Sequence, residues 1–390
     1  MHSHTPLFQL TTRNHRLRAR GVAAELDPAA WTGKNVAQAA ASLLAAAGRD
    51  SAETPLLVGA IPFDPSSPAR LYVPEQVEWG PGTITQPELP AVDSDDRTDL
   101  PEDFGDLVVE GSENLSYCQA VEDAVERIQA GEASKVVLAR QMRIRTAQPF
   151  DPDALYPALV RQNPYAYSFR MDTDGGTLLG ATPELVLGSD RSGRVDSFPL
   201  AGSTPRHDDV VRDSTAAYRL LTSDKNLEEH GYVARAVETT MEEFADFVEA
   251  PSLPELVQTP RLWHLGSRIT GRLREGRSAL ELLYALHPTP AVCGSPTAAA
   301  QRMIAELEDF DRGFFSGLIG WQDAEGNGEW ALTLRCGLVD NRTATLYAGA
   351  GIVGGSIAAA EHEETAVKMS TFAKALGVSD LSAARAVPAS

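Results

Sequence analysis

The sequence predicts an α+β fold with a large, mainly antiparallel β-sheet. Strand-like and helix-like segments follow one another without the strict alternation that is typical of a parallel α/β fold. A hairpin pattern with Asp340 and Asn341 at its turn stands near the C-terminal end. The 390 residues are enough for one large domain or two ordinary ones, each with a substantial core.

The first predicted elements follow an acidic segment. Residues 86–106 are rich in Pro, Asp and Glu, which indicates a surface loop. Ser116 and Gln119 then have the spacing of a helix-capping box, and apolar residues follow at helical spacing. Gly131 is expected to end this helix, because glycine readily adopts the left-handed conformation found there. A strand is predicted directly afterwards, over 135–144.

The later segments continue this mixture of strands and helices. Strands are indicated by apolar patterns with β-branched residues, and helices by apolar residues that recur every three or four positions. The predicted strands are 177–187, 195–201, 329–338 and 343–350, of which the last two form the hairpin, and the predicted helices are 214–248 and 358–376.

Composition excludes several classes of protein. Hydrophobic residues make up 43% of the chain and charged residues 23%, as in an ordinary globular protein. Apolar runs stay well short of the roughly 18 residues of a membrane-spanning helix, and residues 1–6 do not resemble a signal peptide. The net charge of −20 argues against nucleic acid or anionic membranes as partners. An anionic small substrate would need a local cluster of Lys, Arg or metal.

Cysteine usage indicates the compartment. Cys118, Cys293 and Cys336 are scattered, with no C-x-x-C pair and no disulfide framework. A cytoplasmic location is therefore expected.

Two groups of carboxylates are candidate metal ligands. Glu361, Glu364 and Lys368 share one face of the last predicted helix, because they lie at positions i, i+3 and i+7. Glu229 belongs to the Glu-Glu-His triplet 228–230 on the long predicted helix. Carboxylates from two helices can hold one hard cation through oxygen. The alternative for both groups is an ordinary solvated charged surface.

Arg335 is a candidate for binding a carboxylate. In the predicted strand 329–338, alternate residues from Trp330 to Leu338 form an apolar face, so Arg335 is expected on the other face. Its small neighbours, Thr333 and Gly337, leave space for a guanidinium to bind two oxygens. The alternative is an exposed strand arginine.

The glycine run 349–354 matches the dinucleotide pattern G-x-G-x-x-G. We reject that interpretation, because no second parallel strand follows the helix after it. The glycines instead predict a close approach of backbone amides to an anionic ligand.

Three further residues carry possible chemistry. Lys135 opens an apolar strand, and a lysine removed from water can act as a base. Glu184 follows a proline within a predicted strand, which suggests an edge or bulge, and a carboxyl group among apolar neighbours can stay protonated and act as an acid. His264 stands among apolar residues, where a histidine is usually a hydrogen-bonded core residue. An ordinary structural role is the alternative for all three.

Taken together, these segments resemble the chorismate-utilising enzyme family and, within it, the isochorismate synthases. Ten runs match in the family's order across about residues 115–376. They are KVVLAR (135–140), GATPELVL (180–187), PLAGS (199–203), SDKNLEEH (223–230), LWHLGS (262–267), LHPTPAVCG (286–294), ELEDFDRGFFSGLIGW (306–321), GEWALTLRC (328–336), LYAGAGIV (346–353) and ETAVK (364–368).

The resemblance implies large, mainly antiparallel sheets packed face to face with helices outside. Residues 1–110 would form a weakly matched N-terminal part of this sandwich, and 111–390 the chorismate-binding catalytic region, as one intertwined unit. The implied activity is conversion of chorismate to isochorismate, which would feed a siderophore, menaquinone or salicylate pathway. A monomer is expected.

The resemblance also assigns roles to individual residues. Lys135 would activate water for attack on ring carbon 2, and Glu184 would protonate the hydroxyl that leaves ring carbon 4. Magnesium would be held by Glu229 and Glu364, with Glu361 supporting it through water. The enolpyruvyl carboxylate would be bound by Arg335, Tyr347, the Gly349 amide and Lys368. The ring pocket would be lined by Gly202, Ser203, His264 and Ala291.

Differences within the family narrow the activity. Ala201 stands where aminodeoxychorismate synthases usually have a nucleophilic lysine, and anthranilate synthases usually lack a lysine at the position of Lys135. Asn226 stands where the family often has an acid, so magnesium affinity is expected to be lower. The alternatives that remain are a pyruvate-releasing salicylate synthase, a non-catalytic chorismate-binding relative and a nicotinamide oxidoreductase.

Overall fold

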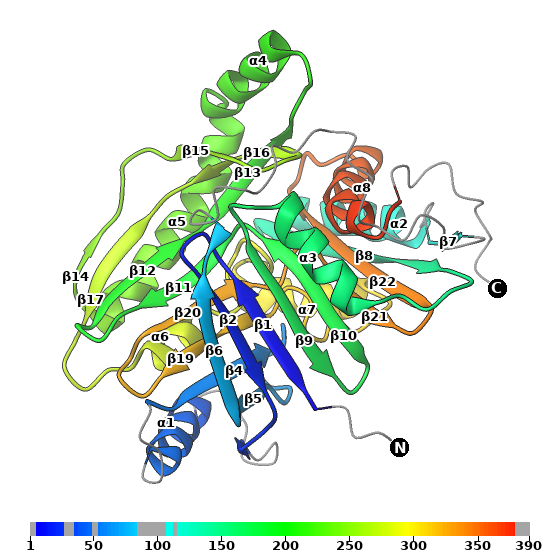
Figure 1. Ribbon diagram of the computed structural model, residues 1–390. Coiled ribbons are helices and arrows are strands. Elements are labelled where there is room, and N and C mark those ends of the chain that lie inside the picture. Colours follow the sequence, from blue (N-terminus) through cyan, green and yellow to red (C-terminus); the bar gives the residue numbers. More distant parts are fainter. Residues whose placement is uncertain (1–4, 27–34, 49–53, 84–106, 112–114, 379–390) are drawn as a thin grey trace.

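The computed structural model describes residues 5–26, 35–48, 54–83, 107–111 and 115–378. The predicted acidic loop 86–106 lies outside these residues. Figure 1 shows β-sheets at the centre of the molecule with helices around them. The helices within the described residues are α1 (Val36–Ala47), α2 (Leu115–Gln129), α3 (Pro152–Gln162), α4 (Val210–Leu221), α5 (Asp224–Phe244), α6 (Ala279–Leu286), α7 (Thr297–Leu307) and α8 (Ala358–Ala375).

The largest sheet has ten strands in the described part of the chain, and its neighbouring strands are antiparallel. Their order is β18-β8-β22-β21-β10-β9-β1-β2-β6, and β7 pairs with β8. The strands are β1 (Leu7–Thr11), β2 (His15–Arg20), β6 (Gln76–Pro81), β7 (Val108–Glu110), β8 (Lys135–Arg145), β9 (Tyr167–Thr173), β10 (Gly176–Thr182), β18 (Gly294–Ser295), β21 (Cys336–Asp340) and β22 (Thr343–Ile352).

A second antiparallel sheet has nine described strands, in the order β14-β17-β12-β11-β20-β19-β4-β5-β3. They are β3 (Ala24–Glu25), β4 (Leu56–Ile61), β5 (Arg70–Val73), β11 (Leu185–Ser189), β12 (Arg194–Phe198), β14 (Ala245–Glu249), β17 (Ile269–Leu273), β19 (Leu318–Asp323) and β20 (Gly328–Leu332). A small sheet contains β13 (Leu200–Pro205), β16 (Leu262–Gly266) and β15 (Glu255–Gln258). Strands from the first 110 residues belong to both large sheets.

The two large sheets pack face to face through a buried apolar cluster. Phe8 and Phe169 from the ten-stranded sheet meet Val58 and Ile319 from the nine-stranded sheet. Side chains of this kind stabilise a fold by about 1.5–3 kcal/mol each when they are buried. Helices α3 and α8 cover the other face of the ten-stranded sheet (Figure 1), where Phe372 of α8 is fully buried. The predicted α+β sandwich is thereby confirmed.

Three predicted strands are each two strands, because the chain crosses from one sheet to another. Strand 177–187 is interrupted at Pro183 and Glu184 between β10 and β11, and strand 195–201 at Pro199 between β12 and β13. Proline has no N–H to donate to a sheet. Strand 329–338 is interrupted between β20 and β21, where Arg335 has a φ of 51°. The predicted placement of Arg335 on one face of a continuous strand is therefore wrong.

Several predicted boundaries are also corrected. The helix expected over 214–248 is two helices, α4 and α5, and its last predicted residues belong to strand β14. The helices are separate because Ser223 caps α5 by accepting a hydrogen bond from the Asn226 N–H. Helix α2 begins at Leu115, so Ser116 lies inside it and is not its cap. In the β21–β22 hairpin Asp340 pairs with Thr343, so the turn lies one residue later than predicted. The last helix, α8, agrees with its prediction.

No helix among the described residues is long and apolar enough to cross a membrane.

Candidate active site

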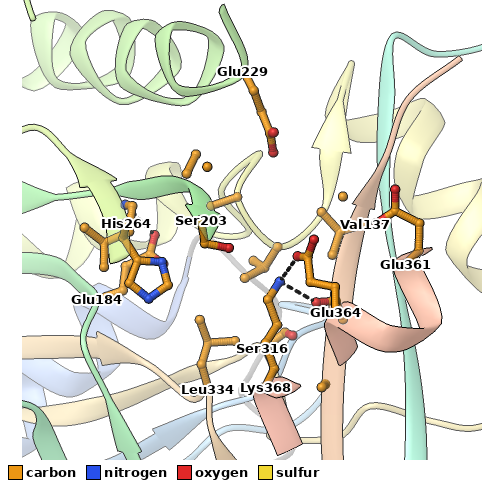
Figure 2. Close-up of a pocket in the computed structure, with 18 of the residues that line it drawn as sticks. Val137, Glu184, Ser203, Glu229, His264, Ser316, Leu334, Glu361, Glu364 and Lys368 are labelled. Carbon is orange, nitrogen blue, oxygen red and sulfur yellow. Dashed lines mark hydrogen bonds and ion pairs between the residues drawn. The ribbon is translucent and has the colours of Figure 1, made fainter. Parts of the chain in front are cut away.

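A cavity of about 260 Å³ lies where the three sheets approach each other beneath helices α5 and α8. All thirteen residues predicted for the site line it: Lys135, Glu184, Gly202, Ser203, Glu229, His264, Ala291, Arg335, Tyr347, Gly349, Glu361, Glu364 and Lys368. Figure 2 shows Glu184 and His264 on one side, Glu361, Glu364 and Lys368 on the other, and Glu229 pointing in from α5. A single cavity therefore gathers residues that are far apart in the sequence.

Lys135 is the first residue of β8, and its side chain is only 8% exposed. Its Nζ donates a hydrogen bond of 2.8 Å to Glu229 Oε1. Gly351 on the neighbouring strand β22 leaves room for this pair, because a Cβ there would lie 2.8 Å from Lys135 Cε. At this position glycine makes room for the lysine–glutamate pair, and the predicted approach of backbone amides to an anionic ligand stays a prediction.

Glu184 lies at the crossing from β10 to β11 and is fully buried. Its backbone carbonyl accepts a hydrogen bond of 3.0 Å from the Leu332 N–H, so the crossings that carry Glu184 and Arg335 run side by side. Burial raises the pKa of Glu184 to about 8, although a hydrogen bond from the Leu200 N–H and the charge of Lys135 oppose the shift. The carboxyl group is therefore largely protonated at neutral pH and can donate a proton.

The buried Glu184 predicts a pH-dependent stability. Below about pH 4.5 the group is protonated in the folded and unfolded chains, so its full contribution is present, and this contribution is lost as pH rises toward about 8. Glu184→Gln has no proton to lose. We expect its melting temperature, relative to the wild type, to rise between about pH 5 and about pH 8.5.

The control for this measurement is Glu78→Gln on the exposed strand β6. Its melting temperature should follow that of the wild type across the same pH range. A difference for Glu184→Gln that stays constant with pH would contradict the assigned protonation of Glu184.

Arg335 and Lys368 supply positive charge to the cavity. Arg335 is partly buried, and its desolvation lowers the pKa of its guanidinium to about 10 despite the nearby carboxylates of Glu364 and Glu184. Lys368 forms an ion pair of 2.6 Å with Glu364, as their i, i+4 spacing predicts, and donates a hydrogen bond of 2.9 Å to the Gly349 carbonyl. The Gly349 N–H lies on the same edge of β22 as this carbonyl, because both groups of one strand residue point to one side.

Helix α8 is fixed over the sheet by a buried arginine. Arg140 of β8 is 1% exposed, and its Nε donates a hydrogen bond of 2.7 Å to Thr365 Oγ1 in the middle of α8. Its Nη2 donates a longer hydrogen bond of 3.5 Å to the His362 carbonyl of the same helix. These bonds hold the helix that carries Glu361, Glu364 and Lys368 against the strand that carries Lys135.

His264 lies on the opposite side of the cavity and is buried. Burial, together with the charges of Arg335 and Lys368, lowers its pKa well below the usual range, so the imidazole is neutral. Within the described residues its Nε2 has no hydrogen-bond partner. Across the small sheet His264 pairs with Ser203, next to Gly202, whose φ of 79° favours glycine. This side of the cavity thus contains a buried polar atom that has no hydrogen-bond partner within the described residues.

The triplet 228–230 separates into three environments. Glu229 faces the cavity, Glu228 is exposed and accepts a hydrogen bond from Tyr232, and His230 is buried. The His230 ring contacts the Ala201 carbonyl at 3.3 Å and Ser267 Oγ at 2.8 Å. His230 therefore has a structural role.

The donor set of the cavity fits a hard cation. Glu229, Glu361 and Glu364 come from two helices and line the cavity, and carboxylate oxygens are the ligands that magnesium prefers. Burial and the neighbouring Glu364 raise the pKa of Glu361. The positive charge nearby is therefore too small to offset the cost of burying its anionic form. Among the described residues no three potential ligands already meet as a metal centre, since Glu229 and Glu364 are held by lysines.

Sequence reasoning missed some residues that line the cavity. Lys225 precedes Glu229 by about one helical turn, and this spacing was the available signal. Phe315 and Ser316 lie in the connection from α7 to β19, and Leu334 lies in the connection from β20 to β21, where no periodic pattern indicates direction.

Comparison with known proteins agrees with this geometry. The family model described as "Chorismate binding enzyme" matches residues 93–377. The chain belongs to this family. A 39% identical relative, isochorismate synthase DhbC of Bacillus subtilis, aligns over 97% of this chain and 96% of its own length. Isochorismate synthase EntC of Escherichia coli K12 is 41% identical over 87% of this chain and 86% of its own.

Solved structures of the family have the same fold. A crystal structure titled as a putative 2,3-dihydroxybenzoate-specific isochorismate synthase, DhbC from Bacillus anthracis, superposes with a TM-score of 0.86 at 33% identity and covers 96% of both chains. The menaquinone-specific isochorismate synthase MenF of Escherichia coli gives a TM-score of 0.80 over 95% of this chain and 88% of its own, and at 24% identity it supports the fold alone. The predicted family and fold are confirmed.

Proposed function

We propose that this chain is an isochorismate synthase that converts chorismate to isochorismate with the help of magnesium. The observation that carries the proposal is that Lys135 and a protonated, buried Glu184 line the same cavity. The relatives named isochorismate synthase, at 39% and 41% identity over most of the chain, support it.

The two catalytic residues have complementary roles. Lys135 takes a proton from the water that attacks ring carbon 2, and Glu184 gives its proton to the hydroxyl that leaves ring carbon 4. Before it can act as a base, Lys135 must leave its ion pair with Glu229 and release one proton to solvent, because an ammonium group has no lone pair with which to accept a proton. Acid–base help of this kind typically contributes about 10²–10⁴ in rate.

Charge complementarity explains how an acidic protein binds a dianion. Arg335 and Lys368 face the cavity and bind the enolpyruvyl carboxylate, with the Tyr347 hydroxyl and the Gly349 amide as further donors. His264, Gly202, Ser203 and Ala291 surround the ring. Glu229, Glu364 and, through water, Glu361 would hold magnesium, which would supply positive charge to the ring carboxylate.

The magnesium assignment is tested by Glu364→Gln. We expect the magnesium concentration for half-maximal turnover to rise about tenfold or more, because a ligand with full negative charge is replaced by a neutral amide. Glu363→Gln, at the exposed neighbouring position on α8, is the matched control. A magnesium dependence of Glu364→Gln equal to that of the control would exclude Glu364 as a ligand.

The function itself is tested by identifying the product. Purified protein is incubated with chorismate, with and without magnesium, and the products are separated by chromatography. Isochorismate that forms only with magnesium is expected. Fluorescent salicylate with pyruvate would identify a salicylate synthase, and unchanged chorismate would indicate a non-catalytic chorismate-binding relative.

The cellular setting follows from the same proposal. All residues assigned to the reaction come from one chain, and the proposal takes the enzyme to act as a monomer. Cys118, Cys293 and Cys336 are free thiols, which is consistent with the cytoplasm. A siderophore or menaquinone pathway would consume the product.

A further inference from the structure

The strand that carries Lys135 is incompletely paired along one edge. Strand β22 pairs with β8 from Val136 to Arg145. On the opposite edge, among the described strands, β18 pairs only with Lys135 and Val136, and β7 pairs only with residues 143–145. Backbone groups between these two short pairings need other partners.

A buried ion pair supplies those partners. Arg312 Nη2 donates a hydrogen bond of 2.7 Å to the Val137 carbonyl, and Glu308 Oε1 accepts one of 2.7 Å from the Ala139 N–H. The side chains of Arg312 and Glu308 are only 2% and 3% exposed. They bind each other as a fork, with Arg312 Nε donating to Glu308 Oε2 at 2.8 Å. The pair thus presents a donor and an acceptor to β8, as a neighbouring strand would.

The same guanidinium reaches a second wall of the cavity. Arg312 Nη1 donates a hydrogen bond of 2.9 Å to the Val292 carbonyl, next to Ala291, and both of these residues line the cavity. The Cys293 carbonyl accepts a hydrogen bond from the Val137 N–H at 2.8 Å. The guanidinium also lies 4.3 Å from the centre of the Phe63 ring. Arg312 therefore joins the Lys135 strand to the loop 291–293.

We propose that Arg312 and Glu308 are positioning residues that hold Lys135 where it can take a proton from the attacking water. The inference rests on the proposed function. Neither side chain lines the cavity, so the pair acts through the backbone of Val137 and Ala139. Lys135 and Val137 point to the same side of β8 and both line the cavity, so a shift of the strand at Val137 moves the amine. Misplacement by about 1 Å can reduce the rate by about 10².

The test uses Arg312→Lys, which keeps the charge but loses the planar fork that binds Glu308, Val137 and Val292 together. We expect kcat to fall about tenfold or more, while KM stays within about threefold, because the residues that bind substrate are unchanged. Arg170→Lys is the matched control. Arg170 is also a buried arginine, 4% exposed and paired with Asp153, but it lies on β9, which does not pair with the Lys135 strand β8.

The control separates positioning from general stability. Arg170→Lys should lower the melting temperature by at least as much as Arg312→Lys, with kcat near that of the wild type. The proposal is overturned if Arg312→Lys loses no more kcat than Arg170→Lys, or if its loss of kcat comes with an equal rise in KM.

If Arg312→Lys does not fold, Glu308→Gln tests the proposal instead. The glutamine side chain can still accept the hydrogen bond from the Ala139 N–H, but it binds Arg312 more weakly. A reduced kcat at unchanged KM supports the proposal, and wild-type kcat overturns it.

Failure of the proposed function gives a different result. In that case the wild-type protein and Arg170→Lys form no isochorismate either, whereas failure of the positioning role leaves both active.

Discussion

Replacing Lys135 by alanine is expected to reduce kcat by about 10²–10⁴, because the attacking water loses its base. Chorismate binding should change little, since Arg335 and Lys368 remain. The magnesium requirement should not increase, because Lys135 no longer competes for the Glu229 carboxylate. Steady-state kinetics at several magnesium concentrations, together with calorimetric binding of chorismate, measure both effects.

Two controls sharpen the Lys135 experiment. Lys374→Ala removes the same charge from the last turn of α8, away from the cavity, and should keep wild-type turnover. Methylamine in the solution should restore part of the turnover of Lys135→Ala, because a small amine fits the space that the side chain leaves. Wild-type turnover in Lys135→Ala would remove this residue as the base.

Glu184→Gln should produce a loss of similar size for a different reason. The amide cannot protonate the leaving hydroxyl, so kcat should again fall by about 10²–10⁴. In the wild type, the pKa of about 8 means that the acid is protonated below that pH and loses its proton above it. Turnover should therefore decline as pH rises through about 8.

The pH profile of the variant provides the comparison. Glu184→Gln should show no decline near pH 8 in whatever turnover remains, because it carries no titrating group at this position. A wild-type rate that continues to rise beyond about pH 9 would contradict the role of Glu184 as an acid.

The helical part of the site could be predicted from local sequence. The spacing of Glu361, Glu364 and Lys368 places them on one face of α8, and all three line the cavity. Within the triplet 228–230, spacing alone did not distinguish Glu229 from its neighbours. That choice depends on which face of α5 packs on Ala201 and Ser267, and these contacts are long-range.

The corner between the sheets could not be predicted in the same way. An alternating apolar pattern reports burial, and it continues through the points where the chain passes from one sheet to the other. Glu184 and Arg335 were therefore placed within strands, whereas they lie between strands. Pro183 was a correct signal of an interruption. The pairing of Lys135 with Glu229 joins residues 94 positions apart, which only the family resemblance brought together.

The most direct test of the account follows the oxygen atom. The purified protein is incubated with chorismate and magnesium in water enriched in oxygen-18, and the product is analysed by mass spectrometry and NMR. We predict isochorismate with the heavy oxygen on ring carbon 2, because Lys135 activates a solvent water. Isochorismate that retains only the oxygen atoms of the substrate, or any product other than isochorismate, would contradict the account.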